Sequence, residues 1–232
     1  MARVALVTGG SRGIGEMIAA GFLTNGVKVY ISSRKKDQCD ATATRLSETY
    51  GAECISIPAN LSELSGIESL VAALSEREDH LDILVNNAGV AWGAPLEEFP
   101  EVGWDKVFDT NVKGVFFLTQ KLLPLLEANA TKEDPARIIN IGSVYGIQGG
   151  NPALYPGMDW DIAPYFVSKH AVHGIAHYLA PWLAKSGVTI NTLHPGGFAG
   201  SEMNEKAMSE RASGLSEMEK AFHAAVPMGR IG

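Results

Sequence analysis

The sequence predicts an α/β protein: one doubly wound domain whose parallel sheet is covered by helices on both faces. Three observations predict it. Short β-rich runs alternate with longer helical segments, the middles of the runs are almost continuously apolar, and a glycine-rich turn follows the first run. Strands that are apolar on both faces are buried on both faces, as in a parallel sheet. A length of 232 residues without a linker or repeat fits a single domain.

The strands and helices are expected in strict alternation, joined by right-handed crossovers. The predicted strands are Arg3–Thr8, Val27–Ser32, Glu53–Pro58, Leu81–Asn86, Ala136–Gly142 and Gly187–Leu193. The predicted helices are Gly13–Asn25, Lys35–Tyr50, Ser62–Glu78, Trp104–Asn129, Ala163–Ser186 and a last segment around Glu202–Ala225. Gly26 and Gly187 follow two of these helices, where a left-handed residue commonly ends a helix. The stretches Ala91–Gly103 and Ile147–Ile162 are expected to be irregular.

Composition excludes several classes of protein. Hydrophobic residues make up 46% and charged residues 19%, so a mainly disordered chain is excluded. The net charge of −7 without a basic run argues against a nucleic acid or an anionic membrane as partner. Cys39 and Cys54 lack metal-site spacing, so we predict no metal site and expect reduced thiols in a cytoplasmic protein. We find no targeting segment or membrane span.

A glycine-rich turn, Thr8-Gly9-Gly10-Ser11-Arg12-Gly13-Ile14-Gly15, follows the first predicted strand. Glycines at 9, 13 and 15 let the backbone turn sharply and approach a pyrophosphate, while the helix that opens at Gly13 directs free N–H groups at that charge. A simple tight turn is the alternative, but the position between the first strand and the first helix favours a dinucleotide.

The end of the second predicted strand indicates which dinucleotide is bound. An NAD enzyme needs a carboxylate there for the ribose 2′-hydroxyl. Instead Arg34 stands at this position, no acid precedes Asp37, and Arg12 can reach the same region. Guanidinium groups form charge-assisted pairs with a 2′-phosphate, so we predict NADP(H). The alternative is that Arg34–Lys36 is only a solvated helix start.

Three side chains are candidates for proton transfer and for hydrogen bonding to a substrate. Tyr165 and Lys169 are four residues apart and share one helix face, and Ser143 follows the fifth predicted strand. A cation beside a tyrosine favours the phenolate, and a shift of its pKa from about 10 to about 7 corresponds to about 4 kcal/mol. A tyrosine tuned in this way exchanges a proton at neutral pH. Ser143 can donate a hydrogen bond to a carbonyl oxygen.

At these residues the sequence resembles the short-chain dehydrogenase/reductase family, and within it the 3-oxoacyl-[acyl-carrier-protein] reductase branch. The motifs that match in order are Thr-Gly-x3-Gly-x-Gly (8–15), Asn-Asn-Ala-Gly (86–89), Asn111, Ser143, Tyr165-x3-Lys169 and Pro195-Gly196. The resemblance implies a Rossmann-type fold and covers nearly the whole chain. Family members continue with a further helix and a last strand, which we do not expect in this sequence.

The resemblance also implies a role for each matched residue. Tyr165 is the general acid, Lys169 lowers its pKa and binds the nicotinamide ribose, Ser143 orients the substrate carbonyl, and Asn111 holds a water for proton relay. The implied cofactor-binding residues are Gly9, Ser11, Arg12, Gly13, Ile14, Gly15, Arg34, Asn60, Leu61, Asn87, Ala88, Gly89, Tyr165, Lys169, Pro195 and Gly196.

Three departures from the family pattern concern the site. Asn60 stands where many members carry Asp against the adenine. The usual Thr after Pro195-Gly196 is missing, and Ser201 is a candidate replacement. The segment between Ser143 and Tyr165 is several residues longer than usual. Its residues 149–162 carry Tyr155, Met158 and Trp160, and we hypothesise that they form part of the substrate wall; the alternative is a surface excursion.

We therefore expect an NADPH-dependent carbonyl reductase whose substrate is a small molecule, for example a 3-oxoacyl thioester. The alternatives are an alcohol, sugar or steroid dehydrogenase that works oxidatively with the same tetrad, and a dinucleotide-binding sensor without turnover. The resemblance implies a homo-oligomer, a dimer or tetramer, formed through the helices Trp104–Asn129 and Ala163–Ser186.

Overall fold

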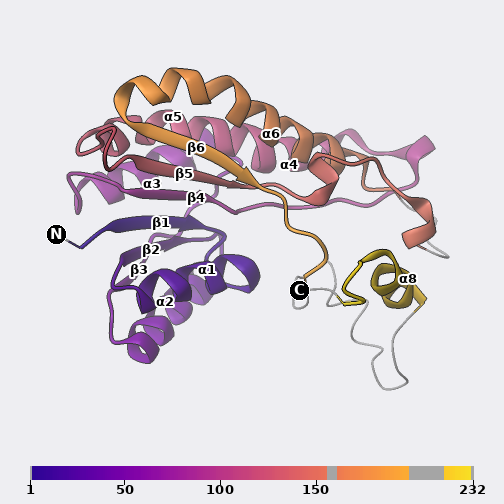
Figure 1. The fold of residues 1–232 in the computed structure, drawn as a ribbon, viewed down its shortest axis with the longest axis horizontal. Helices are drawn as coiled ribbons and strands as arrows, with labels where there is room; N and C mark the ends of the chain where they lie inside the picture. Colours follow the sequence, from indigo (N-terminus) through magenta and orange to yellow (C-terminus); the bar gives the residue numbers. More distant parts are fainter. Residues whose placement is uncertain (1, 156–160, 199–216, 231–232) are drawn as a thin grey trace.

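One parallel sheet organises the molecule (Figure 1). The computed structural model describes residues 2–155, 161–198 and 217–230. In this part of the chain the strands are β1 (Val4–Thr8), β2 (Lys28–Ser32), β3 (Cys54–Ser56), β4 (Ile83–Asn86), β5 (Ala136–Ile141) and β6 (Val188–Leu193). Their order is β3-β2-β1-β4-β5-β6, and every neighbouring pair is parallel. The predicted doubly wound α/β fold is therefore confirmed.

Helices cover both faces of this sheet. Helices α1 (Gly13–Thr24) and α2 (Lys36–Tyr50) pack on one face. Helices α3 (Leu64–Ser75), α5 (Gly114–Glu127) and α6 (Ala163–Leu183) pack on the other, and α4 (Glu101–Phe108) precedes α5. Helix α8 (Glu217–Ala225) lies beyond the carboxyl ends of the strands (Figure 1).

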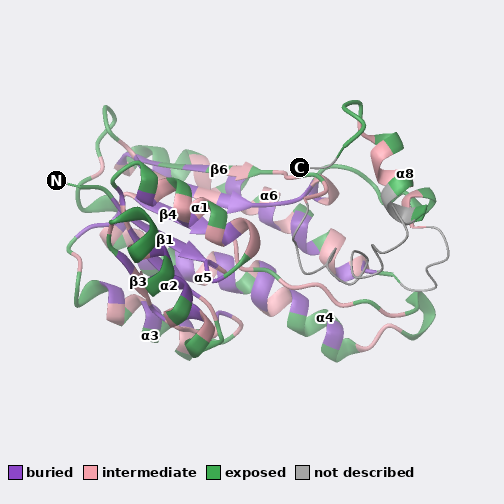
Figure 2. Ribbon diagram, turned by 90° about the horizontal axis from the view of Figure 1, so that it is seen from below, coloured by how far each residue is buried: buried purple, intermediate pink, exposed green. Residues whose placement is uncertain are grey.

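Each strand supplies apolar side chains to two cores, which explains why its sequence is apolar without interruption. In β1, Ala5 and Val7 face α1 and α2, whereas Val4 and Leu6 face α3 and α5. All four are at most 3% exposed, and Figure 2 shows burial concentrated along the strands and the inner faces of the helices. Burial of a Val or Leu side chain contributes about 1.5–3 kcal/mol.

The predicted helix Trp104–Asn129 differs most from the structure. Helix α4 begins at Glu101, after Pro100, and a π turn at Asp109–Lys113 separates it from α5. Gly26 and Gly187 have φ of +71° and +75°, as expected for residues that end helices. Of the last predicted helix, only the part that forms α8 lies in the described residues; Ser201, Met158 and Trp160 lie outside them.

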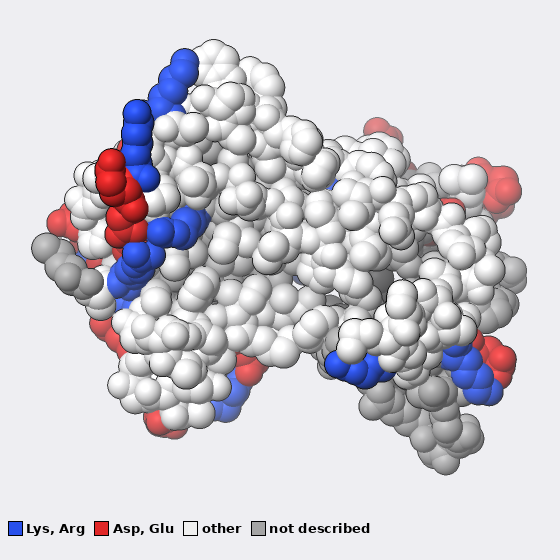
Figure 3. Space-filling view, in the orientation of Figure 1, with Lys and Arg blue, Asp and Glu red and all other residues white. Residues whose placement is uncertain are grey.

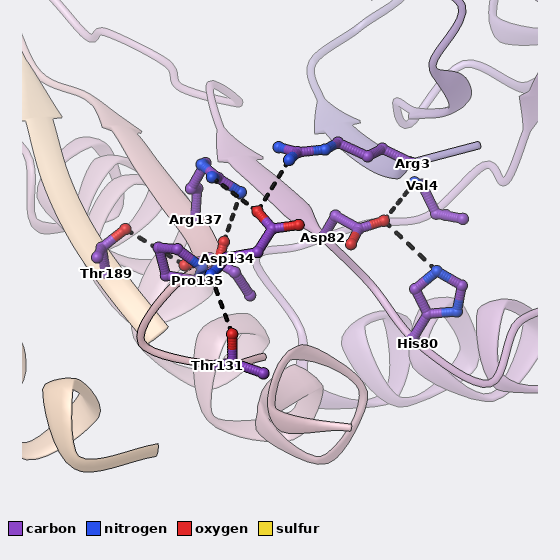
Figure 4. A network of polar contacts seen from close by, with 10 residues as sticks. Arg3, Val4, His80, Asp82, Thr131, Asp134, Pro135, Arg137 and Thr189 are labelled. Atoms are coloured by element: carbon purple, nitrogen blue, oxygen red, sulfur yellow. Dashed lines mark hydrogen bonds and ion pairs between the residues drawn. The ribbon is translucent and has the colours of Figure 1, made fainter. Parts of the chain in front are cut away.

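A polar network joins the amino ends of the strands (Figure 4), which lie at the end of the molecule opposite α8 (Figure 1). The Asp134 carboxylate accepts hydrogen bonds from Arg3 (2.8 Å) and Arg137 (3.0 Å), and Asp82 accepts one from the Val4 amide (2.7 Å). Charged side chains of both signs also gather at this end in Figure 3. Exposed ion pairs contribute little stability individually.

Candidate active site

The carboxyl ends of the strands bring the predicted site residues to one edge of the sheet. The glycine-rich turn follows β1, Arg34 follows β2, Asn87 follows β4, Ser143 follows β5 and Pro195 follows β6. Ligands of doubly wound sheets bind at this edge. Asn111 enters from the π turn before α5, and Tyr165 and Lys169 enter from the first turns of α6.

The glycine-rich turn is closed so tightly that only glycine fits at two positions. Gly9 has a φ of +64°, and a Cβ on it would lie 2.8 Å from Asn87 Nδ2. A Cβ on Gly15 would lie 2.3 Å from the Gly9 carbonyl oxygen. Helix α1 therefore begins directly against the turn. Its N-cap residue, Arg12, makes no side-chain capping hydrogen bond, so the Arg12 side chain does not cap the first-turn N–H groups of α1, which are the groups that bind anions at helix N-termini.

Replacing Gly15 with Ala tests this packing. The added Cβ would lie 2.5 Å from Asn87 Nδ2 as well as against the turn, so the loop must move. We expect a loss of about 1–3 kcal/mol in the free energy of unfolding and at least about tenfold weaker NADPH binding. Thermal unfolding and a fluorescence titration with NADPH measure the two effects.

Gly21→Ala is the matched control, because it lies in the same helix and a Cβ there would have nothing within 4 Å. This variant should keep NADPH affinity and gain up to about 1 kcal/mol from helix propensity. Equal NADPH affinity in the two variants would show that the Gly15 contact does not shape the binding turn.

The Thr8 hydroxyl, to which the sequence analysis assigned no role, fixes the turn to the next strand. Thr8 Oγ1 donates to the Val85 carbonyl (3.2 Å) and accepts from the amides of Asn87 and Ala88 (both 3.0 Å). The Asn87 side chain donates to the Thr8 carbonyl (2.9 Å). Asn87 therefore positions the glycine-rich turn through its amide group, in addition to any contact that it makes with a ligand.

The residues after β2 fit a phosphate. Arg34 is exposed just beyond the strand, whereas Lys36 is engaged by Asp40 at 2.5 Å. Ser32 Oγ is buried at the same end of β2, and within the described part of the chain it has no hydrogen-bond partner. A buried hydroxyl without a partner is uncommon. Together with the uncapped start of α1, these groups fit a dinucleotide with a phosphate near Arg34.

Two predicted adenine contacts are less direct than the sequence suggested. The Asn60 side chain is used locally, since Nδ2 donates to Glu63 (2.7 Å) and Oδ1 accepts from the Ser62 hydroxyl (2.9 Å). The Leu61 side chain is buried in the core beside α3 and α5. A ligand would therefore meet mainly the backbone of these two residues.

Asn111 is buried in the π turn, and both its amide oxygen and its amide nitrogen make hydrogen bonds. Oδ1 accepts from the Val90 amide (2.8 Å), and Nδ2 donates to the Val90 carbonyl (2.9 Å) and to Ser168 Oγ (3.0 Å). The side chain thus ties the loop after β4 to α6. The predicted water relay would have to use the second lone pair of Oδ1 or the backbone of the π turn.

Lys169 is a buried cation beside the tyrosine. It is 5% exposed, and Nζ donates to the Ile141 carbonyl (2.7 Å) and lies 5.5 Å from the centre of the Tyr165 ring. Burial lowers the pKa of Lys169 to about 8. A Cβ on Gly89 would lie 3.6 Å from Nζ and 3.4 Å from Asn111 Oδ1, so these side chains converge on Gly89.

Ser143 and Tyr165 face each other, but the pKa of Tyr165 moves against the expectation. Burial raises this pKa above its usual value, and interaction with the Ser143 hydroxyl lowers it by a smaller amount. Burial thus acts against the expected shift of the Tyr165 pKa toward 7, and the effect of Lys169 on this pKa stays a prediction. The reason is that the phenolate would be poorly solvated, and the ammonium contacts the Ile141 carbonyl and the ring face.

A histidine pair supports the backbone around Ser143. His194 Nδ1 donates to the Ser143 carbonyl (2.7 Å), and His194 Nε2 lies 3.1 Å from His173 Nδ1. The Val144 amide donates to the Pro195 carbonyl (3.0 Å), which holds Pro195 and Gly196 against the same loop.

Among the described residues, no three His, Cys, Asp or Glu side chains are arranged to hold a metal ion.

Comparison with known proteins assigns the family. A model of the family described as short chain dehydrogenase matches residues 3–212. The chain belongs to this family. The predicted resemblance to this family is thus confirmed. No helix in the described ranges is long and apolar enough to cross a membrane.

Named relatives are similar over almost the full chain. The rhamnolipids biosynthesis 3-oxoacyl-[acyl-carrier-protein] reductase of Pseudomonas aeruginosa is 45% identical over 99% of this chain and 84% of its own length. The solved Pseudomonas aeruginosa RhlG/NADP active-site complex superposes with a TM-score of 0.87, at 45% identity and the same coverage. An actinorhodin polyketide ketoreductase solved with NADPH gives a TM-score of 0.84 at 33% identity and covers 100% of this chain and 85% of its own.

Proposed function

We propose that this short-chain dehydrogenase is an NADPH-dependent carbonyl reductase that converts the ketone of a 3-oxoacyl thioester to the secondary alcohol. The observation that carries the proposal is the convergence of Ser143, Tyr165 and Lys169 at the sheet edge that also holds the glycine-rich turn. The relatives that are named 3-oxoacyl-[acyl-carrier-protein] reductase or ketoreductase, and those solved with NADP or NADPH, support it.

Tyr165, Ser143 and Lys169 each have a separate role in the proposed reduction. NADPH, when bound, would supply the hydride. Tyr165 donates a proton to the carbonyl oxygen, and its raised pKa keeps that proton in place at neutral pH until the reaction. Ser143 orients the same oxygen by a hydrogen bond. Lys169 places a positive charge beside the phenolate that remains, which is worth most in a buried site.

A cofactor-oxidation screen tests the proposal. Purified protein is mixed with NADPH and an acetoacetyl thioester, a diketone or a simple aldehyde, and the loss of absorbance at the reduced nicotinamide band is followed. We expect the thioester to give the highest kcat/KM. NADPH binding without consumption across the panel would instead indicate a dinucleotide sensor, and turnover only in a parallel assay with NADP and alcohols would indicate an oxidative dehydrogenase.

Arg34 is proposed to select NADPH. Arg34→Asp replaces a guanidinium with a charge that repels the 2′-phosphate and accepts a hydrogen bond from a 2′-hydroxyl. We expect kcat/KM for NADPH to fall about 10–100-fold and the preference to move toward NADH. Steady-state rates with the two cofactors measure this ratio.

Lys36→Asp makes the same change of charge nearby, but Lys36 is engaged by Asp40. It should alter the NADPH/NADH ratio by no more than a few-fold. If both variants shift the ratio equally, the preference comes from the general charge of this surface and the assignment of Arg34 fails.

We further propose that the chain forms a homo-oligomer in the cytoplasm. The outer faces of α4 and α6 carry exposed apolar side chains, among them Trp104 (41% exposed), Val167 (46%) and Trp182 (60%). Such faces favour association with a second copy.

The cytoplasmic location is supported by the thiols. Cys39 and Cys54 are both buried free thiols, which fits a reducing compartment.

A further inference from the structure

Two tyrosines beside the candidate active site have no part in the chemistry described so far. Tyr145 follows Ser143 by two residues, and its amide donates to Ser143 Oγ (3.2 Å). Its ring stacks on Phe166, with 4.1 Å between the ring centres and 22° between the planes. Phe166 is the residue after Tyr165. Tyr145 is therefore held against both segments that carry the reacting side chains.

Tyr155 joins this arrangement from the segment that is long for the family. It follows the short 3-10 turn Pro152–Leu154, and its hydroxyl contacts the hydroxyl of Tyr145. On its other side the Tyr155 ring meets the ring of Phe222 in α8 edge to face, with 5.5 Å between the centres. The two phenols thus join the Ser143 loop, the long segment and α8, at the edge of the sheet where the strands end.

The phenol pair has hydrogen-bonding capacity left over. Two hydroxyls carry two protons, and the contact between them uses one. Within the described residues neither phenol oxygen has another hydrogen-bond partner. Burial, and to a smaller extent Tyr165, raise the pKa of Tyr145 to about 12, so this hydroxyl stays protonated at neutral pH. The pair therefore keeps one O–H donor that is not used within it, on rings held against Phe166, the residue after Tyr165.

We propose that the Tyr145–Tyr155 pair binds the second carbonyl oxygen of a 1,3-dicarbonyl substrate and thereby determines specificity. The inference rests on the proposed function, because it requires that Ser143 and Tyr165 receive the carbonyl that is reduced. In a 3-oxoacyl thioester one carbon separates the two carbonyl groups, so their oxygens stay close together. Because the Tyr145 ring stacks on Phe166 and its amide meets Ser143 Oγ, the phenol pair borders the segments that would receive the ketone, and we assign the thioester oxygen to its unused O–H.

The double variant Tyr145→Phe/Tyr155→Phe tests the proposal, because it keeps both rings and removes both hydroxyls. The probes are an acetoacetyl thioester and a simple methyl ketone of similar length. We expect the ratio of kcat/KM for the dicarbonyl to that for the mono-ketone to fall about tenfold, mostly through KM. Tyr50→Phe, an exposed tyrosine at the end of α2, is the control for the substitution and should leave the ratio unchanged.

Each other outcome overturns the proposal. An unchanged ratio in the double variant means that the hydroxyls do not recognise the second oxygen. An equal loss toward both probes means that the phenols only hold the loop of Ser143 in place. A wild-type protein that reduces both probes equally well has no such specificity, although the proposed reductase function stands. If the wild-type protein reduces neither probe, the proposed function is contradicted, and this inference is contradicted with it.

Discussion

Tyr165→Phe is expected to lower kcat for carbonyl reduction by about 10³-fold or more while NADPH binding stays within a few-fold of wild type. The substitution removes the hydroxyl that faces Ser143 and keeps the ring against Lys169 Nζ. General acid catalysis contributes about 10²–10⁴-fold, and a phenyl ring cannot replace it. Single-turnover oxidation of bound NADPH separates the loss of chemistry from any loss of binding.

Tyr145 is the alternative proton donor, and the variants Tyr145→Phe and Tyr165→Phe distinguish between the two tyrosines. Tyr145 also has a raised pKa and lies near Ser143, but Gly149 stands four residues after it, where Tyr165 has Lys169. Tyr145→Phe should therefore retain most of the kcat toward a simple ketone. The reverse pattern, with turnover surviving in Tyr165→Phe and lost in Tyr145→Phe, would transfer the acid role and contradict the assignment.

The sequence predicted the fold and the place of the site because both depend on local patterns. Apolar runs such as Val4 to Val7 indicate strands buried on both faces, and these strands must be parallel. Once the strand ends share one edge, the glycine-rich turn, Arg34 and Ser143 must lie there together. The spacing of Tyr165 and Lys169 predicted a shared face of α6 without any knowledge of packing.

Features that depend on depth and on long-range packing could not be predicted in this way. The π turn at Asp109–Lys113 lies in a segment whose apolar pattern continues, so the pattern does not indicate it. The turn places Asn111 so that its side chain bonds Val90 and Ser168, which are distant in the sequence. The direction of the Tyr165 pKa depends on how deeply the phenol is buried. The contact between Tyr145 and Tyr155 joins segments whose irregular sequences carry no periodicity.

Lys169→Met is expected to raise the free energy of unfolding by about 1–2 kcal/mol at pH 7 while strongly lowering kcat. Burial lowers the pKa of Lys169 from 10.5 to about 8, and this difference corresponds to about 3 kcal/mol against the charged form. Loss of the hydrogen bond to the Ile141 carbonyl offsets part of the gain. Thermal or urea unfolding of the two proteins measures the difference.

The pH dependence of that difference identifies the buried charge as its cause. Below about pH 8 the amine is protonated in both states, so the folded wild type carries the full cost. Between about pH 8 and 10.5 the folded state loses the proton while the unfolded state keeps it. Wild-type stability therefore rises relative to Lys169→Met over this range, and the advantage of the variant should shrink by pH 10.

Lys132→Met, at an exposed position, should show neither the gain at pH 7 nor its decline with pH. Two results would contradict the prediction: Lys169→Met is no more stable than wild type at pH 7, or its advantage persists unchanged at pH 10. Either would show that desolvation of the Lys169 ammonium does not lower the free energy of unfolding. A gain that follows the expected pH course would mean that the fold bears a buried cation whose benefit lies in the reaction, because removing it strengthens the protein and disables Tyr165.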